Sequence, residues 1–461
     1  MTGAPRRTDR RPPSRRSRPV LDGARLTAFD VLDGVSSRDA YANLLLPQLL
    51  RERAADLGGR DAAFATQLAY GTLRATGTLD AVLATLVSRP LAELDPRVLD
   101  LLRLGAYQLL DLRVPAHAAV DTTVALTRAI VGTGASGLVN AVLRKVAAGG
   151  DRAAWVERLD GDGDQRLALA TDHPRWIVEA WRDALGDEAE VEPALLADDA
   201  APEVHLVARR VPRDQLVAEA GGQPGPWSPY AVRLGGGDPA RVPSVREGRA
   251  AVQDEGSQLA ALLLARAPLE GPDAAWLDVC AGPGGKAGLL AAVRPEGVRL
   301  TAADRAPHRA ELVRHALRDE DDVEVVVADG RTPPWSPGSF DRVLLDAPCT
   351  GLGALRRRPE VRWRRTPDDV PPLVDLQTAL LDGALASVRP GGVVAYVTCS
   401  PHTDETVAVV DAAAGRDDVE VLPVAPLFPE VPGVARGAYG QLWPHRHGTD
   451  AMFMALLRRT R

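Results

Sequence analysis

From residue 248 onward, short apolar segments alternate with helical or loop segments, and this alternation restricts the fold more than any other feature. The apolar segments are AWLDV, RLTAAD, VEVVVAD, FDRVLLD, GVVAYVT and AMFMALL. Strands that alternate with helices build a doubly wound α/β sheet. Ligands bind such sheets beyond the carboxyl ends of the strands. We therefore expect functional residues at the strand ends, which are Asp278, Asp304, Asp329, Asp346 and Thr398.

The chain before this α/β domain (248–461) has three regions of different composition. Residues 1–19 contain seven Arg and one Asp, which predicts a disordered tail that is either an arm for nucleic acid or a solubilising terminus. Residues 20–148 repeat apolar residues every three or four positions, which predicts an all-α domain of six or seven helices. Residues 149–247 combine helical HPRWIVEAWRDALG with strand-like EVHLVARRV, which predicts a small α+β module or an ordered linker.

Cysteine and lysine are both rare. The three cysteines lie far apart, at positions 280, 349 and 399, which excludes a disulfide framework and a C-x-x-C zinc site. Two lysines, Lys145 and Lys286, stand among 55 basic residues. The net charge of −7 means that local clusters must bind any polyanion. No apolar run reaches the ~18 residues of a membrane span and no signal segment is recognisable, so we expect a cytoplasmic protein without membrane or metal.

The segment from Asp278 to Lys286, DVCAGPGGK, follows a predicted strand and opens a helix. Its glycines let backbone N–H groups approach a ligand at a helix N-terminus. It does not match a P-loop, and it matches a dinucleotide fingerprint only with Ala287 at the last glycine position. Asp304, at the end of the next strand, can bind two ribose hydroxyls. The pattern favours an adenosine-bearing cofactor over a tight structural turn.

Two further motifs place thiols at strand ends. Asp346-Ala347-Pro348-Cys349 follows FDRVLLD, and Cys399 follows the strand GVVAYVT. A single cysteine after a strand is more often a small buried hydrophobe than a nucleophile. All three cysteines of the chain, however, fall at strand ends along one edge, which favours a chemical role.

The densest basic segment outside the tail follows the second motif. Residues 356–365, RRRPEVRWRR, contain six Arg and one Trp against one Glu. Arginine binds phosphate with two hydrogen bonds and an aromatic ring can stack on a base. A salt-bridged helix is the alternative, but acidic partners are missing nearby. We expect the segment to bind a nucleic-acid strand through Arg356, Arg357, Arg358, Arg362 and Trp363.

Taken together, these motifs resemble those of the RNA 5-methylcytosine methyltransferases of the Nop/Sun family. The motifs VQDEGSQLA, DVCAGPGGK, DAPCTGLGALRRRPEVRW and VTCSPHTDE follow one another in that family's order. In the helical region, PAHAAVDTTVALTRA and GLVNAVLRKV resemble a NusB-like RNA-binding domain. The resemblance covers nearly the whole chain after the tail. It implies a class I (Rossmann-like) methyltransferase domain that uses S-adenosylmethionine, an RNA partner (small-subunit 16S rRNA, unassembled or partly assembled), and a monomer.

The resemblance also implies the role of each site residue. The cofactor would be bound by Cys280, Ala281, Gly282, Pro283, Gly284, Gly285, Lys286, Asp304, Arg305, Asp329 and Asp346. Cys399 would be the nucleophile that attacks C6 of cytosine, and Cys349 would assist product release. Asp346 would act near N3 of the base. Lys286 would favour ionisation of the thiol.

The sequence departs from the family pattern at a few places. Thr350 replaces the usual Ser after Pro-Cys, EVHLVARRV lacks an expected Arg-Val-Asn, and Glu405 is one acid where the family is often more acidic. A tRNA target is an alternative to rRNA. A non-catalytic, antitermination-like RNA-binding factor is a second, although it would not need Cys349, Cys399 and Asp346 together. A nucleotide-dependent oxidoreductase would use neither the two thiols nor the Arg cluster.

Overall fold

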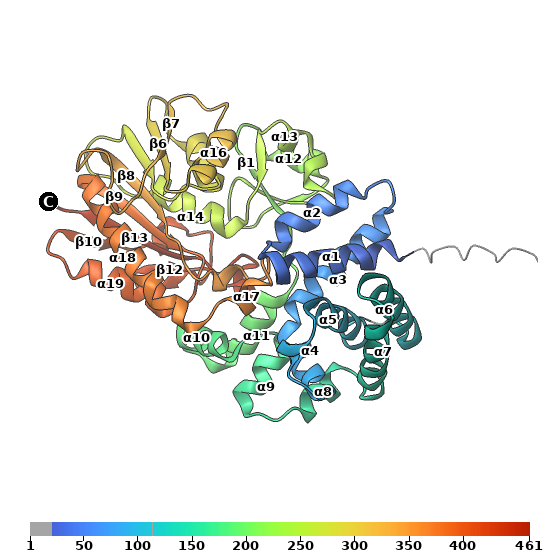
Figure 1. The fold of residues 1–461 in the computed structure, drawn as a ribbon. Coiled ribbons are helices and arrows are strands. Elements are labelled where there is room, and N and C mark those ends of the chain that lie inside the picture. The colour runs from blue at the N-terminus through green and yellow to red at the C-terminus, as the bar shows by residue number, and fades with distance from the viewer. Residues whose placement is uncertain (1–20, 113) are drawn as a thin grey trace, which may run out of the picture. The chain divides into compact units, whose positions relative to one another are not determined.

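The structure is a computed structural model that describes residues 21–112 and 114–461 (Figure 1). The predicted Arg-rich tail lies outside the described residues. The chain divides into two compact units. The first contains the described residues up to Thr72 together with Leu83–Arg152, and the second contains Leu73–Val82 together with Ala153–Arg461. This division differs from the predicted domains, because a short segment inside 20–148 belongs to the second unit.

The first unit is a bundle of helices, as the apolar spacing predicts. Asp22 begins the first helix by accepting a hydrogen bond from Arg25 N at 2.9 Å, and Asp95 caps α5 through Arg97 N. A Cβ on Gly105 would lie 2.5 Å from Leu143 Cδ1, so this glycine lets two helices approach closely. The helices are α1 (Gly23–Arg38), α2 (Ala42–Glu52), α3 (Gly59–Arg74), α4 (Thr76–Ala84), α5 (Pro96–Leu110), α6 (Ala116–Ile130) and α7 (Thr133–Ala148). Of these, α3 and α4 continue into the second unit.

The second unit opens with four helices and a small antiparallel sheet. The helices are α8 (Arg152–Arg158), α9 (Gly163–Ala170), α10 (Arg175–Leu185) and α11 (Glu188–Asp199). The sheet has the order β2-β3-β1-β4 and consists of β1 (His205–Ala208), β2 (Gln223–Pro224), β3 (Ala231–Arg233) and β4 (Ala250–Val252), with α12 (Arg213–Ala220) and α13 (Pro243–Arg246) beside it. The strand predicted in EVHLVARRV is β1. Strand β4 lies past residue 247, where we expected this module to end.

Among the described residues, nine strands form the large sheet, in the order β11-β12-β13-β9-β8-β5-β6-β7, with β10 paired to β13. Strands β5 to β9 pair in parallel, and the C-terminal strands add an antiparallel edge. All six predicted strands are present. The strands are β5 (Ala275–Asp278), β6 (Arg299–Asp304), β7 (Val323–Val327), β8 (Phe340–Asp346), β9 (Val388–Thr398), β10 (Val419–Leu422), β11 (Ala435–Arg436), β12 (Tyr439–Gln441) and β13 (Phe453–Arg459).

Helices cover both faces of this sheet, so the doubly wound fold is confirmed (Figure 1). Alternate residues of β5 enter opposite cores: Trp276 packs with α14 and α15, and Leu277 packs with α18 and α19. The carboxyl ends of the parallel strands therefore meet at one edge. The helices of this part of the chain are α14 (Glu255–Arg266), α15 (Gly285–Val293), α16 (Pro307–Ala316), α18 (Val370–Ser387) and α19 (Val407–Ala414), together with the short helices α17 (Val361–Arg364) and α20 (Pro444–His447), which lie away from the sheet faces.

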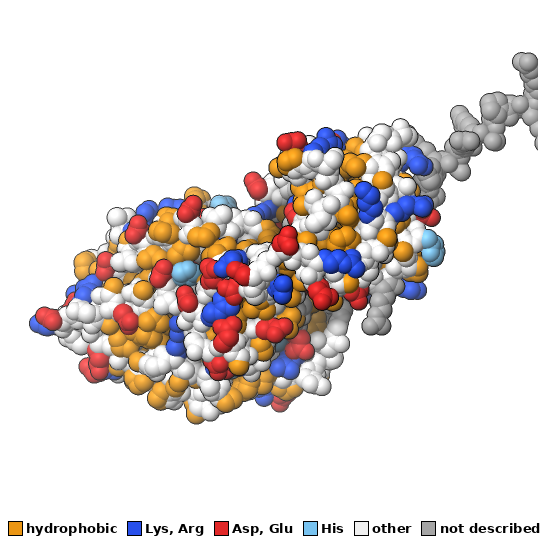
Figure 2. Space-filling model, turned by 90° about the horizontal axis from the view of Figure 1, so that it is seen from below, with side chains coloured by type: hydrophobic (Ala, Val, Ile, Leu, Met, Phe, Trp, Pro, Cys, Tyr) orange, Lys and Arg blue, Asp and Glu red, His pale blue; other side chains and the backbone are white. Residues whose placement is uncertain are grey.

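The surface and the helix lengths bear on possible partners. In Figure 2, basic and acidic side chains are interspersed over the visible face, so no broad field of one sign is seen there. A charged ligand must then be bound by a local group of side chains. No helix among the described residues is long and apolar enough to cross a bilayer.

Candidate active site

The loop between β5 and α15 is fixed to the end of β6. Gly282 N donates a hydrogen bond to Asp304 Oδ2 at 3.1 Å, and Arg309 Nε lies 3.3 Å from the same oxygen. Gly284 has a φ of +103°, and a Cβ there would lie 2.7 Å from Ala316 Cβ. The glycines are therefore required by backbone conformation and close packing, and they place the loop beside a buried carboxylate.

A cavity of about 200 Å³ lies beyond the ends of β5 and β6. Its lining includes four residues that the sequence predicts for the cofactor: Cys280, Asp304, Arg305 and Asp329. Apolar side chains from α18, including Leu380, line it as well. Burial raises the pKa of the Cys280 thiol, which favours its protonated form. A carboxylate beside apolar walls fits a ribose joined to a flat base.

A second cavity, of about 280 Å³ and called the catalytic cavity below, begins on the other side of the loop. Asp278, Lys286, Asp346 and the loop residues Cys280–Pro283 line it. Lys286 Nζ lies 2.8 Å from Asp346 Oδ2, so the predicted lysine and acid are an ion pair. Both cavities include Cys280, and a single ligand can therefore extend around the loop from one to the other.

Asp278 is the most unusual group in the catalytic cavity. Its side chain is fully buried, and neither carboxylate oxygen has a hydrogen-bond partner among the described residues. Burial, together with the negative charge of Asp346, raises the pKa of Asp278 to about 8. A buried carboxyl without partners costs free energy. Its presence at the cavity wall fits a ligand that carries positive charge and hydrogen-bond donors.

The two remaining cysteines lie together at the edge of the sheet. Strands β8 and β9 are parallel neighbours, with Asp346 opposite Val397, and the loops that follow them bring Cys349 Sγ within 3.5 Å of Cys399 Sγ. With Cys349 as donor, this hydrogen bond lowers the pKa of Cys399, and the charge of Lys286 acts in the same direction. The same hydrogen bond, with burial, raises the pKa of Cys349. Cys399 is thus the thiol of the pair that ionises first.

A buried carboxylate that sequence reasoning missed holds these two loops. Glu405 Oε1 accepts hydrogen bonds from Thr350 N (2.7 Å) and Gln377 Nε2 (3.1 Å). Its Oε2 accepts from Ser400 Oγ (2.6 Å) and from Thr350 Oγ1. One side chain therefore connects the residue after Cys349 to the residue after Cys399. The sequence contains this acid, but nothing in its spacing indicates that it is buried.

The structure places Arg356, Arg362 and Trp363, which the sequence predicts as nucleic-acid contacts, in contacts within the protein. Arg362 is fully buried and donates to Asp172 O (2.8 Å) and Asp199 Oδ1 (2.6 Å). Trp363 Nε1 donates to Leu73 O at 2.8 Å. Arg356 is buried and pairs with Asp450 at 2.6 Å. The acidic partners missing nearby in the sequence come from distant segments.

The other two arginines of the cluster differ from these. Arg357 lines the catalytic cavity, where it pairs with Asp254 and with Asp450 Oδ2 at 2.9 Å. The charges of these two carboxylates outweigh the effect of burial and raise the pKa of Arg357. Arg358 is exposed. Of the predicted RNA-contact residues, Arg357 and Arg358 therefore stay predictions.

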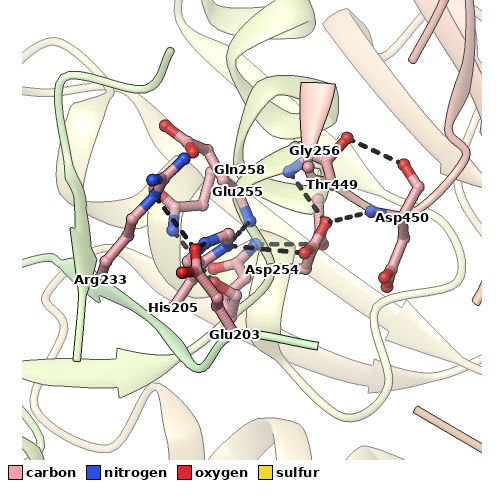
Figure 3. Close-up of polar contacts among 12 residues, drawn as sticks. Glu203, His205, Arg233, Asp254, Glu255, Gly256, Gln258, Thr449 and Asp450 are labelled. Carbon is pink, nitrogen blue, oxygen red and sulfur yellow. Dashed lines mark hydrogen bonds and ion pairs between the residues drawn. The ribbon is translucent and has the colours of Figure 1, made fainter. Parts of the chain in front are cut away.

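The small sheet is joined to the catalytic domain by a polar cluster around the start of α14. Figure 3 shows His205 of β1 pointing toward Asp254 and Glu255, and Glu255 N donates to His205 Nδ1 at 3.2 Å. Glu255 Oε1 accepts from Trp227 N and Ser228 N, each at 2.7 Å. Asp254 Oδ2 accepts from Asp450 N at 3.1 Å. The cluster fixes the small sheet beside the catalytic cavity.

The comparisons with known proteins identify two regions. Residues 264–458 match the family model described as 16S rRNA methyltransferase RsmB/F, and residues 22–148 match the NusB family. A protein of Mycobacterium tuberculosis that carries a methyltransferase name is 53% identical, with 96% of this chain and 98% of that protein covered. Ribosomal RNA small subunit methyltransferase B of Pseudomonas syringae pv. tomato is 35% identical, with 94% and 96% covered.

A solved structure shares the fold over nearly the whole chain. The crystal structure of PH0851 has a TM-score of 0.81 at 21% identity and covers 95% of this chain and 98% of that one. The structure of NSun6 from Pyrococcus horikoshii with SFG has a TM-score of 0.55 at 19% identity, covering 62% and 98%. At these identities the likeness concerns the fold alone.

Proposed function

Because the chain belongs to the RsmB/F family of 16S rRNA methyltransferases, we propose that it transfers a methyl group from S-adenosylmethionine to C5 of a cytosine in 16S rRNA. The observation that carries the proposal is the pair of thiols 3.5 Å apart beside the Lys286–Asp346 ion pair. We further propose that the protein acts as a cytoplasmic monomer on unassembled or partly assembled RNA.

Cys399 would carry out the first chemical step, the attack on C6 of cytosine. C5 of cytosine is a poor nucleophile, and attack by a thiolate at C6 makes it enamine-like. The lowered pKa of Cys399, caused by the hydrogen bond from Cys349, supplies the thiolate. Lys286 and Asp346 line the catalytic cavity as an ion pair. Asp346 would act near N3 of the base, and the Lys286 ammonium would offset the negative charge that develops on the ring. The target base must be unstacked to expose C6, as in an RNA loop.

The residues around the cofactor loop fit S-adenosylmethionine. Asp304 would bind the ribose hydroxyls, Arg305 and Asp329 would border the adenine, and Cys280 to Lys286 would hold the methionine part. The two unpartnered oxygens of Asp278 fit a ligand that carries a sulfonium and an ammonium group. When bound, this cofactor supplies an electrophilic methyl group.

Cys349 would carry out the release step, because its hydrogen bond with Cys399 changes during the reaction. The hydrogen bond to Cys399 is the largest cause that raises the pKa of Cys349. Once Cys399 is bonded to C6, it is no longer a thiolate that accepts this hydrogen bond. Cys349 then loses its proton to water more easily, and its thiolate can take the proton from C5. The electron pair of the C5–H bond re-forms the C5–C6 double bond, and Cys399 leaves as a thiolate, which restores the aromatic ring.

Bisulfite sequencing of RNA from a deletion strain, with complementation by the wild-type gene, tests the proposal. We expect one 5-methylcytosine in 16S rRNA to disappear and to return on complementation. Loss of a tRNA 5-methylcytosine instead would overturn the rRNA target. Unchanged 5-methylcytosine in all RNA would contradict the proposed reaction and favour a non-catalytic RNA-binding factor.

A further inference from the structure

A third cavity, of about 350 Å³, lies between the small sheet and the cofactor loop. We call it the basic groove. Its lining comes from three places: Arg209 and Arg246 in the small module, Pro283–Gly285 in the cofactor loop, and His315, Ala316, Arg318 and Asp319 at and after the end of α16. None of these basic residues takes part in the chemistry proposed above. The groove therefore needs an explanation of its own.

Arg209 is the central basic residue of the groove. Its Nη2 donates to Gly285 O at 3.1 Å, and its guanidinium lies so close to Gly288 that a Cβ there would come within 2.4 Å of Arg209 Cζ. Its Nε is buried and has no acceptor among the described residues, where Arg209 also forms no ion pair. Burial lowers the pKa of Arg209 to about 10. The charge of Glu320 acts on Arg209, but Glu320 pairs with Arg210. A partly desolvated guanidinium that forms no ion pair costs free energy, which an anion in the groove would offset.

The other charges of the groove leave an excess of positive charge. Arg246, His315 and Arg318 are exposed, and Asp319 is the acidic residue of the lining. Asp319 is shared by Arg318 (3.5 Å) and by Arg210 (3.1 Å), and Arg210 also pairs with Glu320. Arg246 forms no ion pair with any residue that the structure describes. The lining thus contains three arginines, Arg209, Arg246 and Arg318, and one carboxylate, Asp319, which already forms ion pairs.

The groove is continuous with the catalytic cavity. Val252, Pro283 and Gly285 line both, and Val252 is an exposed apolar residue at their shared rim. A polymer that leaves the catalytic cavity along this rim enters the groove directly. Arginine guanidinium groups bind phosphate oxygens with two hydrogen bonds.

We propose that the basic groove binds a backbone phosphate of the RNA strand next to the target nucleotide, through Arg209, Arg246 and Arg318. The proposal rests on the proposed RNA methyltransferase function and adds to it the path of the strand. Because Arg209 also donates to Gly285 O, the same side chain contacts the strand and the cofactor loop.

The test is the affinity for a 16S rRNA fragment, measured by fluorescence anisotropy between 50 and 200 mM salt. The Arg246→Ala/Arg318→Ala variant removes two exposed side chains, so the fold is retained. We expect binding to weaken about tenfold, and the slope of log affinity against log salt to fall by about 1 per lost phosphate contact. The matched control is Arg299→Ala, an exposed arginine at the start of β6, the end of that strand opposite Asp304. Wild-type affinity and slope in the double variant would overturn the proposal.

A second variant separates a strand phosphate from free phosphate. Arg209→Met keeps the apolar stem, and circular dichroism checks its fold. If inorganic phosphate raises the melting temperature of the wild type but not of Arg209→Met, while the double variant binds RNA normally, the groove is a free-phosphate site and the proposal is wrong. If the variants weaken RNA binding but the wild type methylates no cytosine, the proposal that the groove binds RNA is retained and the proposed reaction is wrong.

Discussion

Two buried carboxylates at the same edge of the sheet have opposite surroundings. Glu405 and Asp278 are both fully buried. Both oxygens of Glu405 accept hydrogen bonds, from Thr350, Gln377 and Ser400, whereas neither oxygen of Asp278 has a partner among the described residues. The difference separates two kinds of site residue. The protein alone supplies all hydrogen-bond partners of Glu405, which positions the thiols. Asp278 would gain hydrogen-bond partners only from a bound ligand.

The sharpest test of the thiol region removes each sulfur in turn. Cys399→Ala should abolish methylation, because no other thiol can attack C6. Cys349→Ala should form a covalent protein–RNA adduct more slowly, because Cys399 loses the hydrogen bond that lowers its pKa. The adduct should then persist, because the C5 proton is not removed. Methyl transfer and a gel shift under denaturing conditions measure the two outcomes. The double variant is the control and should form no adduct. Full activity of Cys399→Ala would show that the assigned nucleophile is wrong.

Glu405→Ala should affect both stability and rate. It leaves the partners of the carboxylate unsatisfied, which should cost about 3 kcal/mol of unfolding free energy. The thiol loops should shift, and a displacement of ~1 Å can lower a rate about 100-fold. Glu405→Gln keeps the shape and should recover much of both losses. Denaturant unfolding measures the free energy of unfolding, and single-turnover kinetics measure the rate of methyl transfer. A Glu405→Ala protein with wild-type stability and rate would show that Glu405 does not position the thiols.

Asp278→Asn should show the reverse pattern. The fold loses no hydrogen bond, so stability should change little, but the affinity for S-adenosylmethionine should fall about tenfold, because an interaction with a charged ligand is lost. Isothermal calorimetry measures the affinity. Glu405→Gln, which lies outside the cofactor cavities, is the matched control and should bind the cofactor normally. Equal losses of affinity in both variants would remove the distinction between the two carboxylates.

The pH dependence of stability should distinguish the wild type from Asp278→Asn. The pKa of Asp278 is about 8 in the folded protein, well above that of an unfolded aspartate at about 4. The folded state therefore holds the proton more tightly, and the stability that this provides is present below pH 4 and is lost as the pH rises toward 8. The wild type should lose stability relative to Asp278→Asn between pH 5 and 8. A constant difference across this range, measured by urea unfolding, would contradict the raised pKa.

The sequence predicts the features of this site that depend on local order along the chain. Strand alternation and terminal residues were enough to place Asp346, Cys349 and Cys399 at one edge, because parallel strands share their carboxyl ends. Burial and long-range pairing were not predictable in this way. Arg356 and Arg362 pair with acids 94 and 163 residues away, so a segment that looks unpaired in sequence has its acidic partners in distant parts of the chain. The importance of Asp278 comes from missing partners, which are visible only in three dimensions.

The assignment of Leu73–Val82 to the second unit has a consequence for the timing of synthesis. Thr78 Oγ1 donates a hydrogen bond to Leu169 O, 91 residues later in the chain. Leu73 O accepts a hydrogen bond from Trp363 Nε1, 290 residues later. At roughly 5–20 residues per second, the ribosome delivers the first partner after about 5–20 s and the second after about 15–60 s. The start of α4 therefore leaves the ribosome long before the residues that form these hydrogen bonds with it.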